Sequence, residues 1–146
     1  MNISTTRFGA VRITDDDVLT FVDGLIGMED CRRWVLLADA RNTALGWLQC
    51  VERADVALAV VSPRRFVPDY QIRVSRRDIQ PLGLADPNRA QVLAIVSQSG
   101  GSLAVNLKAP LLIHLEHRVG RQIIARDDHA VRHVLVDAPV PLRKAA

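Results

Sequence analysis

The chain has 146 residues, of which 49% are hydrophobic and 24% are charged, with a formal net charge of +3 and a pI near 9.4. These fractions are close to the averages of soluble globular proteins and therefore exclude a chain that is disordered throughout. The longest apolar runs, such as VALAVV at 56–61, are far shorter than the ~20 residues of a membrane-spanning helix, so we expect no membrane span.

Short apolar segments recur along the chain, separated by Gly, Pro, Asp and Asn, without a sustained period of 3.6 residues. In chain order they lie at 8–13, 18–21, 34–38, 47–51, 57–61, 70–74, 92–96, 103–107, 111–115, 122–125 and 134–136. Segments of this length and spacing are typical of strands. We therefore predict an all-β fold, a small antiparallel β-barrel-like single domain, because closure removes the exposed edges of so many short strands.

The longest interruption is the polar stretch SRRDIQPLGLADPNRAQ at 75–91. It is long enough to be a mobile loop, and we expect at most one or two short helical turns in the whole domain. The barrel domain is predicted over residues 1–140. Residues 141–146, PLRKAA, are predicted to form a basic tail whose composition is compatible with disorder.

Two features bear on the cellular compartment. The first residues, MNISTTRFGAVRI, show no basic segment followed by an apolar stretch and a cleavage site, so we expect no export and a cytoplasmic protein. Cys31 and Cys50 have no CxxC spacing, and in a reducing compartment they are expected to be free thiols.

Four histidines near the C-terminal end are the only candidates for a metal site. His129 and His133, with Asp127, could supply nitrogen and oxygen ligands to zinc if they met on one surface. His114 and His117 are predicted to point to opposite faces of one strand, which spoils that pair. The alternative is that all four histidines are solvated at the surface, and we expect no metal and no cofactor.

No catalytic motif is present in the sequence. GxSxG, HExxH and GxxxxGK[ST] are absent, and GLIG at 24–27 lacks the third glycine of a dinucleotide-binding fingerprint. The acidic runs 15–17 and 127–128 are better explained as turn residues than as a glycosidase pair, whose carboxylates come from separate elements. We therefore expect no enzymatic activity.

The stretch SPRRFVPDYQIRV at 62–74 is more elaborate than a hairpin requires. Its arginines, Phe66 and Tyr70 offer the basic and aromatic side chains that a small β-barrel would use to bind RNA directly, which is the alternative function. Trp34 and Trp47 lie within apolar segments, where core packing is expected. The nineteen basic residues are offset by sixteen acidic ones, which favours a mixed, solvated surface.

Five segments together resemble the flagellar assembly factor FliW family, in that family's order and spacing and over nearly the whole chain. They are FVDGLIGMED (21–30), GWLQCVE (46–52), LAVVSPRRFVPDYQIRV (58–74), VNLKAPLLIHLE (105–116) and GRQII (120–124). The sequence departs from the family pattern at Met28, where Phe is usual, and at His114, where Asn is common. Ser62 and Arg64 stand where Asn and Phe usually flank the proline. Arg64 places a charge on the loop that is expected to meet a partner, so we expect this change to bear on partner affinity.

The resemblance implies a cytoplasmic, non-enzymatic binding protein. FliW-like proteins bind the translational regulator CsrA, which relieves its repression of flagellin messenger RNA, and they bind newly made flagellin, which competes for them. The implied partners are therefore CsrA and flagellin, with no membrane and no direct nucleic-acid partner, and we expect a monomer.

Eight residues are predicted to contact a partner: Arg64, Phe66, Val67, Pro68, Asp69, Tyr70, Asn106 and Lys108. A groove lined by the apolar members could receive the apolar face of a flagellin helix, with Phe66 and Tyr70 as fixed anchors. The alternative is that Phe66 and Tyr70 tuck into the barrel mouth and seal it. Asn106 likewise has a structural alternative, in which its side chain bonds neighbouring backbone at a turn.

Overall fold

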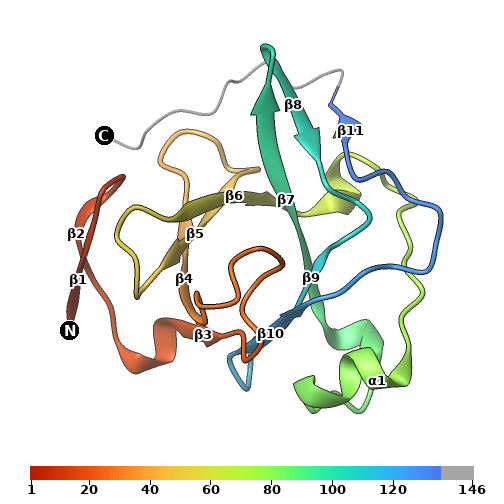
Figure 1. Cartoon of the computed structure of the whole chain (residues 1–146), viewed down its shortest axis with the longest axis horizontal. Coiled ribbons are helices and arrows are strands. Elements are labelled where there is room, and N and C mark those ends of the chain that lie inside the picture. Colours follow the sequence, from red (N-terminus) through yellow and green to blue (C-terminus); the bar gives the residue numbers. More distant parts are fainter. Residues whose placement is uncertain (136–146) are drawn as a thin grey trace.

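The computed structural model describes residues 1–135 of the chain (Figure 1). Its strands are β1 (Asn2–Thr5), β2 (Gly9–Arg12), β3 (Val18–Thr20), β4 (Arg33–Ala38), β5 (Gly46–Cys50), β6 (Ala57–Val61), β7 (Gln91–Ser99), β8 (Ser102–Val105), β9 (Leu111–His114), β10 (Val119–Gln122) and β11 (His133–Val134). One short helix, α1 (Arg76–Ile79), is joined by the 3-10 turns η1 (Asp15–Asp17), η2 (Pro63–Arg65), η3 (Gln80–Leu82) and η4 (Pro87–Arg89). Within this part of the chain no helix has the length and hydropathy to cross a membrane.

Seven strands close into a barrel in the order β7-β6-β5-β4-β3-β10-β9, and β9 pairs back to β7. The register places Leu111 opposite Leu93 at this closure. Every pairing is antiparallel except that of β3 with β10, where Thr20 lies opposite Val119 in a parallel bridge. The predicted all-β barrel is confirmed, with this one parallel contact as an addition.

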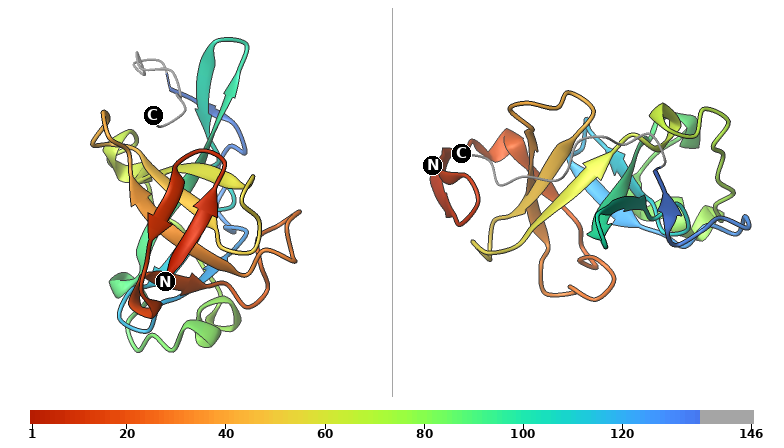
Figure 2. Two further views of the ribbon diagram at one scale, coloured as in Figure 1. Left: turned by 90° about the vertical axis from the view of Figure 1, so that its left-hand side faces the viewer. Right: turned by 90° about the horizontal axis from the view of Figure 1, so that it is seen from above.

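Two pieces lie outside the closed barrel. β1 and β2 form a separate hairpin beside it (Figure 2). β7 is nine residues long, so beyond its barrel pairings it also pairs with β8, and β8 pairs with β11. The molecule is therefore a barrel with one flared sheet edge and one attached hairpin.

The barrel interior is filled by side chains that alternate inward along the strands. This first core cluster consists of Leu19, Phe21, Leu25, Cys31, Trp34, Leu48, Cys50, Val60, Leu93, Leu111 and Ile113. Both cysteines are buried free thiols, as the sequence predicts. Burial raises the pKa of Cys50 to about 12, so this thiol is neutral at physiological pH and unreactive as a nucleophile.

A second core lies on the outer face of the barrel wall. Trp47 is 2% exposed there and packs edge-on against Phe8 of the β1–β2 hairpin, with 6.0 Å between ring centroids. Its indole Nε1 donates a hydrogen bond of 3.0 Å to Asp39 Oδ1, which lowers the pKa of Asp39. Trp34 is fully buried in the first core, so the core assignment of both tryptophans is confirmed.

The turn between β5 and β6 is fastened by a buried polar side chain. Gln49 is 0% exposed, and its Nε2 lies within hydrogen-bond distance of the carbonyl oxygens of Cys50, Arg53, Ala54 and Val56, at 3.0 to 3.3 Å. Its Oε1 is buried without a hydrogen-bond partner among the described residues. An apolar side chain at this position would leave turn carbonyls without their side-chain donor.

The polar stretch 75–91 folds over one end of the barrel as α1, η3 and η4. The Ser75 hydroxyl caps α1 by accepting from the backbone N–H of Asp78 at 3.1 Å. Buried Leu82 packs beneath this segment against Leu112 and Ile123 as a third apolar cluster. The segment contains more helical turns than expected, although each is only one turn long.

The predicted strand at 70–74 is wrong, because this segment forms no ladder in the structure. Apolar and polar residues do alternate along it, but its backbone contacts Arg126 and Asp127 in the segment after β10 instead of pairing with a strand. Two smaller differences are that β10 begins three residues before the predicted 122–125 and that β1 was not predicted. The predicted domain limit at 140, the tail 141–146 and Val136 lie outside the described residues.

Candidate partner-binding surface

The loop after β6 has a defined shape that begins at its first proline. Ser62 is the extended residue before η2, and Pro63 occupies the first position of the turn, where its missing N–H costs nothing. The backbone N–H of Val67 donates to Pro63 O, and that of Tyr70 donates to Val67 O, both at 2.9 Å. Since Pro63 and Tyr70 are both buried, the residues between them form a short loop fixed at its two ends.

Tyr70 is not the exposed anchor that the sequence suggests. Its side chain is 3% exposed in the second core, its hydroxyl donates a 2.6 Å hydrogen bond to Leu107 O, and its ring lies 4.6 Å from that of His129. Burial, reinforced by the negative charge of Asp127, raises the pKa of Tyr70 to about 12. Tyr70 is therefore buried, as the sealing alternative expects, but it packs in the second core on the outer face of the barrel wall and not in the barrel mouth.

The residues between these fixed ends are presented to solvent. Phe66 is 36% exposed, Val67 is half-buried against the second core, and Pro68 and Asp69 are exposed. Arg64 crosses the base of the loop, where its Nε donates a 3.0 Å hydrogen bond to Tyr70 O. An aromatic side chain held on such a fixed loop is the kind of group that anchors protein interfaces.

Asn106 and Lys108 lie beside this loop, because the Tyr70 hydroxyl donates a hydrogen bond to the carbonyl of Leu107, the residue between them. Asn106 Oδ1 accepts from the backbone N–H groups of Lys108 and Ala109, each at 3.1 Å. The structural alternative for Asn106 is therefore observed, and its side chain forms an Asx-type turn. Lys108 Nζ donates to Asp127 O at 2.7 Å.

Asp127 connects this surface to the segment that follows β10. Its carboxylate accepts from the backbone N–H and from Nε of Arg73, and the backbone hydrogen bond in particular lowers the pKa of Asp127. His129 Nε2 lies 2.6 Å from Gln71 O, so that nitrogen carries the proton. These contacts occupy two of the three groups considered as zinc ligands, and among residues 1–135 no cluster of three or more histidine, cysteine, aspartate or glutamate residues could hold a metal ion.

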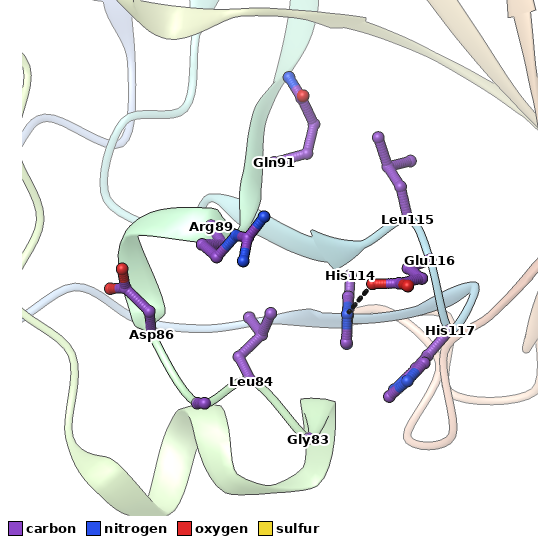
Figure 3. A pocket seen from close by; sticks show the side chains of 10 residues that line it. Gly83, Leu84, Asp86, Arg89, Gln91, His114, Leu115, Glu116 and His117 are labelled. Atoms are coloured by element: carbon purple, nitrogen blue, oxygen red, sulfur yellow. Dashed lines mark ion pairs between the residues drawn. The ribbon is translucent and has the colours of Figure 1, made fainter.

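A separate open pocket of about 550 Å³ lies where the 76–90 segment meets the β9–β10 turn (Figure 3). His114 Nδ1 donates to Leu82 O at 2.9 Å, and Glu116 Oε2 lies 3.9 Å from His114 Nε2. The expectation that His114 and His117 point to opposite faces is wrong. The chain turns after β9, with Arg118 at φ 55°, and the two imidazole rings lie 4.0 Å apart.

This pocket carries side chains of both signs. Arg89 points into it, and Asp86 and Glu116 stand at its rim (Figure 3). A mixture of this kind does not select one class of small ligand. The loop at 64–69 and its neighbours therefore stay the candidate surface for recognition.

The sequence and the fold were compared with known proteins. The family model described as "FliW protein" matches residues 2–135. A protein from Natranaerobius thermophilus named "Flagellar assembly factor FliW" is 35% identical over 139 residues, covering 92% of each chain. Another of that name from Bdellovibrio bacteriovorus is 37% identical over 131 residues, covering 88% of this chain and 75% of the relative. The solved structure titled "Crystal structure of the flagellar assembly factor FliW" shares the fold, with a TM-score of 0.86 at 23% identity over 96% of this chain and 100% of that one.

Proposed function

The chain belongs to the FliW family of flagellar assembly factors, and from this premise we propose that it binds the translational regulator CsrA and flagellin as alternative partners. Flagellin that accumulates would occupy the protein, CsrA would be released, and translation of flagellin messenger RNA would be repressed. Both partners are made in the cytoplasm, so the proposal includes a cytoplasmic, monomeric protein. It involves no catalysed reaction, cofactor or metal.

The observation that supports a binding role is the presentation of Phe66. The loop at 64–69 is held by buried Pro63 at one end and buried Tyr70 at the other, while Phe66 remains 36% exposed. A loop that is already ordered loses little conformational entropy when a partner binds. We assign direct contact to Arg64, Phe66, Val67, Pro68, Asp69 and Lys108, and a supporting role to Tyr70 and Asn106.

The test is a competition experiment. If the two partners are alternatives, occupying the protein with one lowers its affinity for the other, and linkage requires the same penalty in both directions. A coupling of about 1–3 kcal/mol corresponds to a change of about 5- to 150-fold in each dissociation constant. Calorimetric titration with CsrA in the presence and absence of saturating flagellin, and the reverse titration, measures both penalties.

Unchanged affinities in these titrations, together with a stable three-component complex on a sizing column, would reject the partner switch even if both proteins bind. Failure of the protein to bind either partner would reject the proposed function as a whole.

Direct RNA binding is the second candidate, and one observation favours it. Residues 62–77 contain five arginines and one aspartate, a balance suited to phosphate. RNA binding through several phosphates weakens steeply with salt, with a slope of about −0.7 per neutralised phosphate for single strands. Titration of a fluorescent 20-nucleotide RNA at several salt concentrations distinguishes this candidate from a purely apolar protein contact.

A further inference from the structure

Charge is distributed unevenly between the two halves of the described chain. Residues 1–61 carry nine acidic and six basic side chains, whereas residues 62–135 carry eleven basic and six acidic ones. In Figure 1, β1, β2, β4 and β5 lie toward the left and β8, β11 and α1 toward the right, while β3 with β10 and β6 with β7 meet between them. The modest net charge of the protein therefore hides an acidic side and a basic side.

On the basic side, contacts between distant segments gather cations into one strip. Lys108 Nζ donates a hydrogen bond to the backbone carbonyl of Asp127. The preceding residue, Arg126, donates its backbone N–H to Arg73 O at 3.3 Å. Arg121 Nη1 donates to Arg77 O at 3.1 Å. We call this set the basic strip: Arg64, Arg65, Arg73, Arg76, Arg77, Lys108, Arg121 and Arg126. The segments that carry most of these residues, from the end of β6 down to α1 and the one that follows β10, run along the right-hand side of Figure 1.

Several of these cations are not neutralised within the protein. Arg73 pairs with Asp127 at 3.2 Å and Arg121 with Asp23 at 3.7 Å. Across residues 1–135, by contrast, the exposed side chains of Arg65, Arg77 and Arg126 have neither an ion-pair nor a hydrogen-bond partner. Unpaired guanidinium groups are available for bidentate contacts with carboxylates or phosphates.

We propose that the basic strip, with Phe66 at its upper end, is the flagellin-binding surface and receives a carboxylate-rich, partly apolar segment of that protein. This inference rests on the proposed function. Phe66 and Pro68 would take the apolar contacts, and the unpaired arginines would meet the carboxylates around them. An interface with an apolar centre and arginines near it matches the composition of protein–protein contacts.

Charge complementarity decides between flagellin and the other proposed partner. A protein that binds RNA presents a basic surface to the phosphates, so the RNA-binding surface of CsrA would be repelled by the strip. RNA itself fits the strip less well than a protein does, because single-stranded binding uses exposed aromatic platforms. Of the six aromatic side chains, all within the described residues, only Phe66 is exposed.

The strip should mainly accelerate association. The eight cations of the strip outnumber the four carboxylates of the same segments, Asp69, Asp78, Asp127 and Asp128. A net field of this kind raises association rate constants by roughly 10- to 1,000-fold at low salt and loses this effect as salt is added. Flagellin binding is therefore expected to depend on salt, although part of its contact is apolar.

The experiment uses two triple variants with the same change in net charge. R65E/R77E/R126E reverses three strip arginines whose side chains have no partner in the fold. R12E/R32E/R41E reverses three exposed arginines of the acidic half that form no ion pair and no side-chain hydrogen bond among the described residues, although the charge of Arg41 lies near Asp39. Flagellin association is measured by surface plasmon resonance at 50 and 300 mM salt, CsrA and a 20-nucleotide RNA are measured in parallel, and thermal melting checks the fold.

The expected result is that R65E/R77E/R126E weakens flagellin binding by about tenfold or more at low salt, mostly through the association rate, and flattens its salt dependence. R12E/R32E/R41E should retain flagellin binding. The neutral variant R65Q/R77Q/R126Q should fall between wild type and the reversed triple, and it serves as the test if the reversed triple fails to fold.

If R65E/R77E/R126E and R12E/R32E/R41E both bind flagellin as tightly as the wild-type protein does, the strip assignment is overturned and the proposed function is left intact. Loss of RNA binding alone would overturn it in favour of the RNA candidate, and loss of CsrA binding alone would assign the strip to that partner instead. A wild-type protein that binds neither CsrA nor flagellin would remove the proposed function and the inference with it.

Discussion

Phe66 and Tyr70 are four residues apart in one loop, yet their environments are opposite. Phe66 is 36% exposed, whereas Tyr70 is 3% exposed with its hydroxyl bound to Leu107 O. The sequence could not separate these two roles, because both aromatics stand in the same mixture of arginine and proline. The deciding contact comes from a residue far along the chain, which local pattern does not reveal.

Variants at these two positions should therefore fail in different ways. Phe66→Ala is expected to weaken partner binding by about 1–4 kcal/mol with little change in melting, because an exposed anchor is removed. Tyr70→Phe keeps the ring but leaves Leu107 O without its donor, so it should cost about 1–3 kcal/mol of unfolding free energy while binding is retained. Urea denaturation and partner titration on the same samples test both; a destabilised Phe66→Ala would show that Phe66 also seals the barrel.

Two buried groups predict how stability changes at high pH. The folded-state pKa values of Tyr70 and Cys50 are both raised to about 12, above the ~10 and ~8.5 of unfolded chains. Because the folded state favours the neutral forms, their contribution is complete below the unfolded pKa values and is lost as pH rises toward 12. Unfolding measured from pH 8 to 12 should show this loss, and Tyr70→Phe and Cys50→Ala should each flatten it; an unchanged slope in both variants would contradict the assignment.

At the scale of secondary-structure elements, the strands were predictable where the barrel pairs them. The apolar run at 57–61 forms β6 with the predicted bounds, because it lies between two neighbouring strands. The alternating segment at 70–74 forms no strand, because its backbone meets Asp127 and the loop around it instead of a strand. Periodicity reports which face of a segment is buried, but a strand also requires a partner strand.

The β5–β6 hairpin supplies a prediction at this scale. Gln49→Leu removes the side-chain donor to the turn carbonyls of Arg53, Ala54 and Val56, and it should lower the unfolding free energy by about 1–3 kcal/mol. Gln98→Leu, at an exposed position of β7, is the control and should stay within about 0.5 kcal/mol of wild type. Hydrogen exchange of the 51–56 amides should accelerate only in Gln49→Leu. Equal protection of these amides in both variants would contradict the role of the Gln49 side chain in holding the turn.

For the whole molecule, composition predicted the fold class but concealed the charge pattern. Basic pairs such as Arg64-Arg65 and Arg76-Arg77 have acidic residues nearby in sequence, which suggested a uniformly mixed surface. Folding brings residues 62–77 beside Arg121 and Arg126, and the strip forms only through these contacts between distant segments.

Trp47 joins the parts of the molecule, because it lies on the barrel wall beneath the β1–β2 hairpin and bonds to Asp39. Trp47→Ala should lower the unfolding free energy by roughly 3–5 kcal/mol or unfold the protein. Leu36→Ala, on the neighbouring strand β4 at 40% exposure, is the matched control and should have a small effect. Melting of Trp47→Ala like that of wild type would refute the second core as a stabilising element.

The parallel bridge between Thr20 and Val119 also governs how the chain can fold during synthesis. β3 emerges early from the ribosome, but its second neighbour, β10, is made only after almost all of the barrel. Until then the open edge of β3 and the apolar lining of the barrel have no cover. Contacts between such distant residues slow folding and prolong the exposure of aggregation-prone edges. The nascent protein is therefore expected to reach its folded form only after translation of β10, and its folding rate adds a delay before a new copy can bind a partner.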